Sequence, residues 1–163
     1  CGIGFPGGTK IMEYARNAPS SQFKKDDPLY PCNDLENNFG PIYSFACGRT
    51  QPTLLMNRFN LQYQDVAKIC INAESNDFKM ACIDALGFIA AQSKTAEEII
   101  KQCTTIEDTL LMSRCARAAA GELIFQNILN WQQQAPAVCD KLNVDQELCT
   151  TYINQIIQDY NRK

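Results

Sequence analysis

Cysteine is the residue that most constrains how this chain can fold. Nine of the 163 residues are cysteines, and all but Cys1 fall into four consecutive pairs. The members of each pair lie 15, 12, 12 and 10 residues apart, and the first members of successive pairs lie 38, 33 and 36 residues apart. The pairs are Cys32 and Cys47, Cys70 and Cys82, Cys103 and Cys115, and Cys139 and Cys149. This regular spacing indicates a repeated structural unit, of a length typical of helical repeat arrays.

Three roles are open to the paired cysteines: disulfide bonds, metal ligands and reduced thiols in a core. Zinc sites and catalytic redox pairs use closer spacings such as C-x-x-C, which do not occur here, and the sequence has no histidine. Two helices joined by a short turn can bring such cysteines within the roughly 4.4–6.8 Å between Cα atoms that a disulfide requires. We therefore expect four disulfides, with reduced thiols as the main alternative. Disulfides would imply export to the periplasm, the cell surface or the extracellular space.

Cys1 stands outside the four pairs. Because Gly2 follows it, Cys1 is a candidate for lipidation of the kind found on bacterial lipoproteins, and such a lipid is the one membrane attachment that we expect. The chain continues without the polar tether that lipoproteins usually have. A disulfide to another chain and a free thiol are the alternatives.

Proline and glycine divide the chain near residue 52. Residues 1–52 contain six of the seven prolines and six of the eight glycines, so we expect loops and short helices there. Residues 53–163 carry apolar residues at helical spacing, and no alternating run bounded by a hairpin turn occurs. We predict one all-α domain over residues 1–163, built of disulfide-stapled α-hairpin repeats. The hairpins would form either a solenoid-like array or a compact bundle.

Apolar spacing and capping signals give the expected helices. Thr95, with Glu98 three residues later, predicts a capping box before a helix that ends near Cys103. Pro136 is expected to begin a short helix, and Asp145 is expected to cap the last one. One further helix is expected to begin after Pro52 and to include Leu61. Others are expected over residues 64–70 and 78–91 and over one long apolar-periodic stretch, 106–134.

Internal similarity supports the repeat. Residues 82–87, Cys-Ile-Asp-Ala-Leu-Gly, align with residues 115–120 and the following Gly121, and each segment begins 12 residues after a first cysteine. Small residues after the second cysteine would permit neighbouring helices to approach closely. A chance alignment of two alanine-rich helices is the alternative.

The same segments carry a family resemblance. Residues 70–87 and 103–121, in which a C-x₁₁-C pair is followed by a C-x-x-G/A-x-G phrase, resemble a group of exported, mostly bacterial proteins, and residues 32–52 have a similar pattern. Such proteins often carry a His-Gly-x-Gly-His phrase, but the equivalent here, residues 2–5, lacks both histidines, so no metal or catalytic role carries over. Residues 82–87 are more loosely similar to cysteine-bridged Sel1-like repeats, and that resemblance implies a binding scaffold.

Composition excludes several functions. Without histidine, Ser-His-Asp and Cys-His catalysis are impossible. The adjacent carboxylates at 26–27, 97–98 and 107–108 would diverge by about 100° on a helix and are expected on the solvated surface. A net charge of −3 argues against nucleic-acid binding, and no apolar run is long enough to span a membrane. We therefore expect no catalytic, cofactor or metal-binding residues.

These observations predict an exported, non-catalytic binding or structural protein. Its rigid helical surface would contact a protein partner or copies of itself at the cell surface. The candidate contact residues are Trp131, an aromatic anchor, and Tyr152, Ile156 and Tyr160 on the apolar stripe of the last helix. A carrier of a small hydrophobic ligand or lipid is the alternative, and an enzyme of unknown class is the second alternative.

Overall fold

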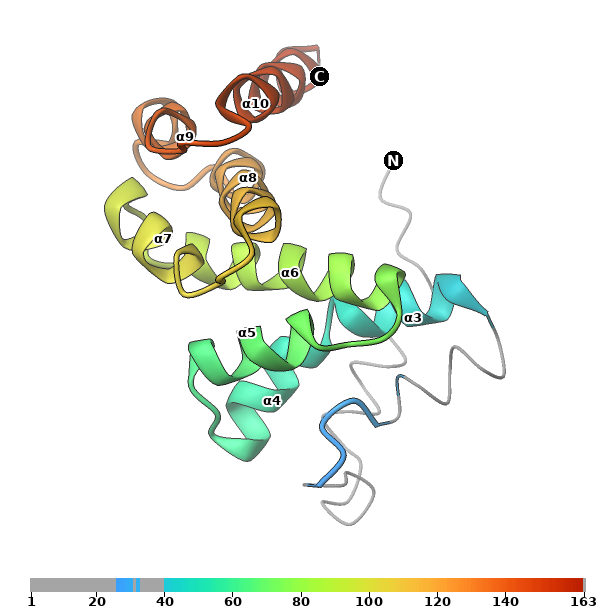
Figure 1. Ribbon diagram of the computed structural model, residues 1–163. Helices are drawn as coiled ribbons and strands as arrows, with labels where there is room; N and C mark the ends of the chain where they lie inside the picture. Colours follow the sequence, from blue (N-terminus) through green and yellow to red (C-terminus); the bar gives the residue numbers. More distant parts are fainter. Residues whose placement is uncertain (1–25, 31, 33–39, 163) are drawn as a thin grey trace. The chain divides into compact units, whose positions relative to one another are not determined.

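The fold of the described residues is all-α, as expected. The computed structural model describes residues 26–30, 32 and 40–162, and within these ranges it contains helices and no strand. Figure 1 shows the helices joined by turns. They are α3 (Pro41–Gly48), α4 (Gln51–Phe59), α5 (Tyr63–Ile71), α6 (Asn76–Ala91), α7 (Ala96–Cys103), α8 (Thr109–Phe125), α9 (Trp131–Asp140) and α10 (Gln146–Asn161). The predictions made for Cys1 lie outside the described residues.

The four expected disulfides are present. Cys32 is bonded to Cys47 on α3, and the other three bonds join α5 to α6, α7 to α8 and α9 to α10. The Cα atoms of the bonded pairs lie 5.6, 5.6, 5.8 and 5.5 Å apart. All eight cysteines are at most 1% exposed, so the bonds lie in the core. The eight paired cysteines are therefore neither metal ligands nor reduced thiols in this structure.

The starts of α4 and α7 show how local sequence sets the helix boundaries. Pro52 lies in the first turn of α4 rather than before it, where its fixed φ and missing N–H do no harm. At α7, the Thr95 hydroxyl accepts a hydrogen bond from the backbone N–H of Glu98, as the predicted cap requires. Leu61 lies beyond α4, because Asn60 takes a left-handed conformation with φ 54° and ends the helix.

The prediction of one helical stretch over residues 106–134 is wrong. Helix α8 ends at Phe125, and Asn127 adopts a left-handed φ of 48°. The N–H of Asn127 donates to the carbonyl of Ile124, and the N–H of Ile128 donates to that of Leu123, both at 3.0 Å. These two bonds form a Schellman motif, which satisfies the last carbonyls of α8 and turns the chain away.

Two further boundaries differ from expectation. Pro136 does not begin a helix but lies inside α9, which starts five residues earlier at Trp131. A hydrogen bond of 2.8 Å from the N–H of Ala96 to the side-chain oxygen of Gln134 anchors this helix to the start of α7. Asp145 stands at the N-terminus of α10, as expected, but at a φ of 59° its side chain makes no capping hydrogen bond.

The chain divides into two compact units, Cys1–Cys82 and Ile83–Lys163, and the division falls within α6. In the first unit, the buried Gln51 side chain donates hydrogen bonds to the carbonyls of Pro28 and Tyr30, at 2.7 and 3.4 Å. These bonds tie residues 26–30 to the start of α4. In the second unit, α8 and α9 contact each other, and each of them also contacts α7 and α10.

Three glycines lie where α3 approaches α6, where α6 approaches α8 and where α8 approaches α10. A Cβ atom on Gly48 of α3 would lie 2.6 Å from the carbonyl oxygen of Phe78 on α6. A Cβ on Gly87 of α6 would overlap the carbonyl oxygen of Cys115 on α8. One on Gly121 of α8 would lie 2.9 Å from the ring of Tyr152 on α10. The close approach predicted for the small residues after Cys82 and Cys115 is confirmed.

Candidate functional site

The residues predicted to contact a partner gather at one end of the second unit. Trp131 is the first residue of α9, and its ring meets that of Tyr160 on α10 edge-on, with centroids 6.4 Å apart. The indole N–H donates a 3.0 Å hydrogen bond to the side-chain oxygen of Asn127. Two helices and the turn before α9 therefore hold the Trp131 and Tyr160 side chains together.

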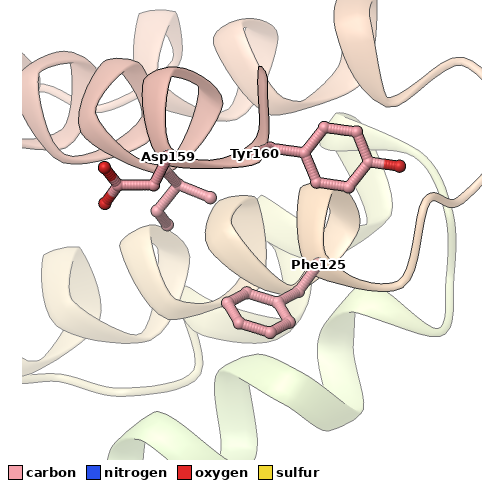
Figure 2. A pocket seen from close by; sticks show the side chains of 4 residues that line it. Phe125, Asp159 and Tyr160 are labelled. Carbon is pink, nitrogen blue, oxygen red and sulfur yellow. The ribbon is translucent and has the colours of Figure 1, made fainter. Parts of the chain in front are cut away.

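A hollow of about 710 Å³ lies between the C-terminal ends of α8 and α10. The described residues that line it are Phe125, Ile156, Asp159 and Tyr160. We call it the α8–α10 groove. Figure 2 shows Asp159 and Tyr160 projecting from α10 in opposite directions, with the Phe125 ring below them on α8. Its size falls in the range of roughly 300–1,000 Å³ that is typical of small-molecule sites.

The groove follows from the way in which the two helices pack. At Gly121 the absence of a side chain allows α8 to contact Tyr152 and Ile156 of α10 closely. One turn later Phe125 occupies the same face of α8, and there the helix ends. Because α10 continues to Asn161, its last turn faces the open end of α8.

Large apolar side chains that line the groove, or that lie in the turn following α8, are exposed to solvent. Phe125 is 73% exposed, Leu129 in the following turn is 83% exposed and Tyr160 is 46% exposed. Together with the half-buried Trp131 they form what we call the apolar cluster. Gathered apolar side chains on a surface mark sites of interaction more often than isolated ones do.

Among the described lining residues, Asp159 is the one with a charged side chain. Its carboxylate accepts hydrogen bonds of 3.3 and 3.4 Å from the side-chain amide of Gln155. Arg162, the residue that follows α10, lies 3.9 Å away, and both members of this ion pair are largely exposed. Such an exposed pair contributes little to stability, so the carboxylate remains accessible to a second cation.

Sequence reasoning found part of this site. Trp131, Ile156 and Tyr160 were predicted as contact residues, and the structure brings them to one place. Tyr152 lies outside the groove lining, against Gly121 and under the guanidinium of Arg117, which is 5.9 Å from the ring centre. Phe125 and Asp159 were missed, because both resemble ordinary helix residues until the end of α8 is known.

The acidic side chains of the described residues lie apart from one another or on the surface. Within them, no group of three or more cysteine, aspartate or glutamate residues could hold a metal ion. Glu97, Glu98 and Glu107 are exposed, as predicted for the adjacent carboxylates, and Asp108 accepts hydrogen bonds from the first N–H groups of α8. Across the same described ranges, no helix has the length and apolarity needed to cross a membrane.

The fold defines the chain as an all-helical, disulfide-rich protein with an apolar groove at one end of its second unit. Comparison with protein-family models, with curated proteins and with solved structures found no match for it. Its function must therefore be argued from the residues themselves.

Proposed function

We propose that this chain is an exported, non-catalytic binding protein that presents a rigid helical surface to a protein partner or to copies of itself. The observation that carries the proposal is the apolar cluster, which sits on helices that disulfides hold in place. Helices α7 to α10 are tied in pairs by Cys103–Cys115 and Cys139–Cys149, so the surface loses little conformational entropy when it binds.

Export is supported by the cysteines. Four buried disulfides in one chain suit an oxidising compartment, because the thiol systems of the cytosol keep such cysteines reduced. The resemblance of the cysteine-pair segments to exported proteins points the same way. A location at the cell surface, in the periplasm or outside the cell is therefore part of the proposal.

A repeat arrangement would explain how the surface is kept rigid. Each of the three glycine contacts between helices has a polar contact about one turn earlier. The three polar contacts are Ser44 with Ser75 at 3.1 Å, Asp84 with Arg114 at 2.7 Å, and Arg117 over the ring of Tyr152. We propose that this pairing of a glycine with a polar residue sets the register of one hairpin on the next.

The proposed function can be tested by partner capture with matched variants. The disulfide-intact chain would serve as bait in the extracellular or periplasmic fraction of its source. We expect one protein, or the chain itself, to bind the wild type and Leu110→Ser but not Leu129→Ser. Both leucines are exposed, at 64% and 83%, but Leu110 lies at the opposite end of α8 from the cluster. Equal capture by both variants, or a monomer that captures nothing, would contradict the proposal.

A second candidate function is favoured by the α8–α10 groove. A carrier of a small hydrophobic ligand needs an apolar hollow between helices, and the groove has a suitable volume and lining. This candidate predicts that a ligand co-purifies with the protein, which mass spectrometry of an organic extract would detect. A groove that is always recovered without a ligand would favour the protein partner.

A further inference from the structure

We propose that the α8–α10 groove binds a free, single-chain amphiphilic cation, with its apolar body in the groove and its ammonium group beside Asp159. The proposal rests on the ligand-binding candidate above and gives that ligand a chemical class. It concerns a dispersed small molecule rather than the headgroup of a lipid in a bilayer.

The apolar body of the ligand is argued from the groove lining. Phe125 and Ile156 offer carbon surface from two different helices, and Phe125 is 73% exposed. Covering such surface is favourable in proportion to the apolar area that is removed from water. A flexible hydrocarbon chain fits within a hollow of about 710 Å³.

The positive charge of the ligand is argued from Asp159 and the aromatic rings. Asp159 supplies the one charged side chain among the described lining residues, and its carboxylate is held by the amide of Gln155. The faces of Phe125 and Tyr160 also attract cations through their ring quadrupoles. The competing cation is Arg162, whose contact with Asp159 is long and exposed, so an ammonium group can displace it. An anionic amphiphile would instead be repelled by Asp159.

The same geometry supplies a reporter. The chain contains a single tryptophan, and the Trp131 ring touches Tyr160, which lines the groove. A ligand that moves Tyr160 or covers its ring therefore changes the surroundings of Trp131. Its fluorescence should follow binding without any label.

The experiment titrates the full, disulfide-intact chain with three amphiphiles of equal chain length, all below their micelle concentrations. They are decyltrimethylammonium, decyl sulfate and decyl maltoside. We expect saturable binding at one site, with the ammonium compound bound at least about fivefold more tightly than the sulfate, because the charge of Asp159 has opposite effects on the two. Calorimetry on the same samples would give the stoichiometry.

Variants place the binding site. Phe125→Ala should weaken binding of the ammonium compound by about tenfold, since it removes the largest apolar contact. Asp159→Asn should bring the affinities of the three compounds together, whereas Arg162→Gln should increase affinity for the ammonium compound. Leu110→Ala, also an exposed apolar truncation on α8, should change nothing. Circular dichroism and disulfide mapping would show that each variant is folded.

Several results would overturn the proposal. Equal binding of the three amphiphiles, or affinities that Phe125→Ala and Asp159→Asn leave unchanged, would remove the assigned site. Co-sedimentation with phosphatidylcholine vesicles would assign the groove to a membrane lipid instead. A dimer in sedimentation velocity that Phe125→Ala dissociates would assign it to a second copy of the chain. These readouts are independent of partner capture at Leu129, so the two proposals can fail separately.

Discussion

At the scale of single residues, three glycines make the same kind of contact with different neighbours. Near Gly87 a methyl group would meet backbone and the Ala118 side chain, whereas near Gly121 it would meet the ends of the Tyr152 and Ile156 side chains. Backbone in the middle of a helix cannot move aside, but a ring edge and a terminal methyl can. The tolerance of the two positions should therefore differ.

We expect Gly87→Ala to lower the free energy of unfolding by about 1–3 kcal/mol, because overpacking outweighs the better helix propensity of alanine. Gly121→Ala is the matched variant, and its effect should stay within about 1 kcal/mol of zero. Urea unfolding followed by circular dichroism would measure both. An equal loss of unfolding free energy in the two variants would show that contact with helix backbone does not determine the cost of the added methyl group.

Tyr63, at the start of α5, should make the stability of the protein depend on pH in the alkaline range. Burial raises its pKa above the ordinary value of 10.0, because the charged phenolate is poorly solvated there. Its contribution to stability is fully present below pH 10 and is lost as the pH rises further, since the unfolded state releases the proton first. Tyr63→Phe should flatten the fall in stability above pH 10 and remove a phenolate that appears late in absorbance titration. An unchanged titration curve would contradict the burial argument.

At the scale of helices and turns, Asn127 decides where α8 ends. Its left-handed conformation suits glycine as well as asparagine, but alanine there should cost about 1 kcal/mol. Asn127→Gly and Asn127→Ala both remove the hydrogen bond to Trp131, so their difference isolates the backbone effect. We expect thermal unfolding to show the alanine variant clearly less stable than the glycine variant. Equal stability would mean that the turn adapts without strain.

The same turn explains which elements could be predicted. The helix over residues 95–103 was found because Thr95 and Glu98 are a strong local signal, and the bond between them is present. Residues 106–134 have apolar residues at helical spacing throughout, so periodicity alone cannot reveal an interruption. The break depends on two asparagines, Asn127 and Asn130, with positive φ, a conformation that sequence only weakly indicates.

Part of the candidate site could be predicted from residue type, and part depends on where α8 and α10 end. Trp131 and the stripe on α10 stand out by residue type, because large aromatic side chains on helix surfaces are informative in themselves. Phe125 becomes a lining residue only because α8 stops there and α10 continues. Such a site depends on where two helices end in space, and that information is tertiary.

At the scale of the whole molecule, the disulfides should determine stability. Replacing Cys103 and Cys115 together by alanine should lower the free energy of unfolding by about 3 kcal/mol, because the unfolded chain regains the freedom of the closed loop. Both residues are fully buried, so the disulfides of the native wild type should also resist mild reductants. Urea unfolding and thiol counting would measure these effects. Rapid reduction of the folded protein would contradict the buried placement.

The cysteine pattern predicted which cysteines are bonded, but it did not predict how the helices divide into two units. The connectivity followed from spacing, since each pair lies across one turn between two helices. The division into two units inside α6 had no sequence signal, because residues 78–91 form one uninterrupted apolar pattern. Spacing can therefore predict the crosslinks, but not where the chain divides into two units.

The local nature of every crosslink has a consequence for how the chain is made. Each disulfide joins cysteines separated by only 10–15 residues, and no other cysteine lies between them. A chain threaded through an export pore from its N-terminus would present both partners of a pair before the first cysteine of the next. Short loops also close at the lowest entropic cost. For the three pairs that follow Cys32–Cys47, the native partner of each first cysteine is therefore the next cysteine to emerge, so their oxidation can proceed in order of emergence.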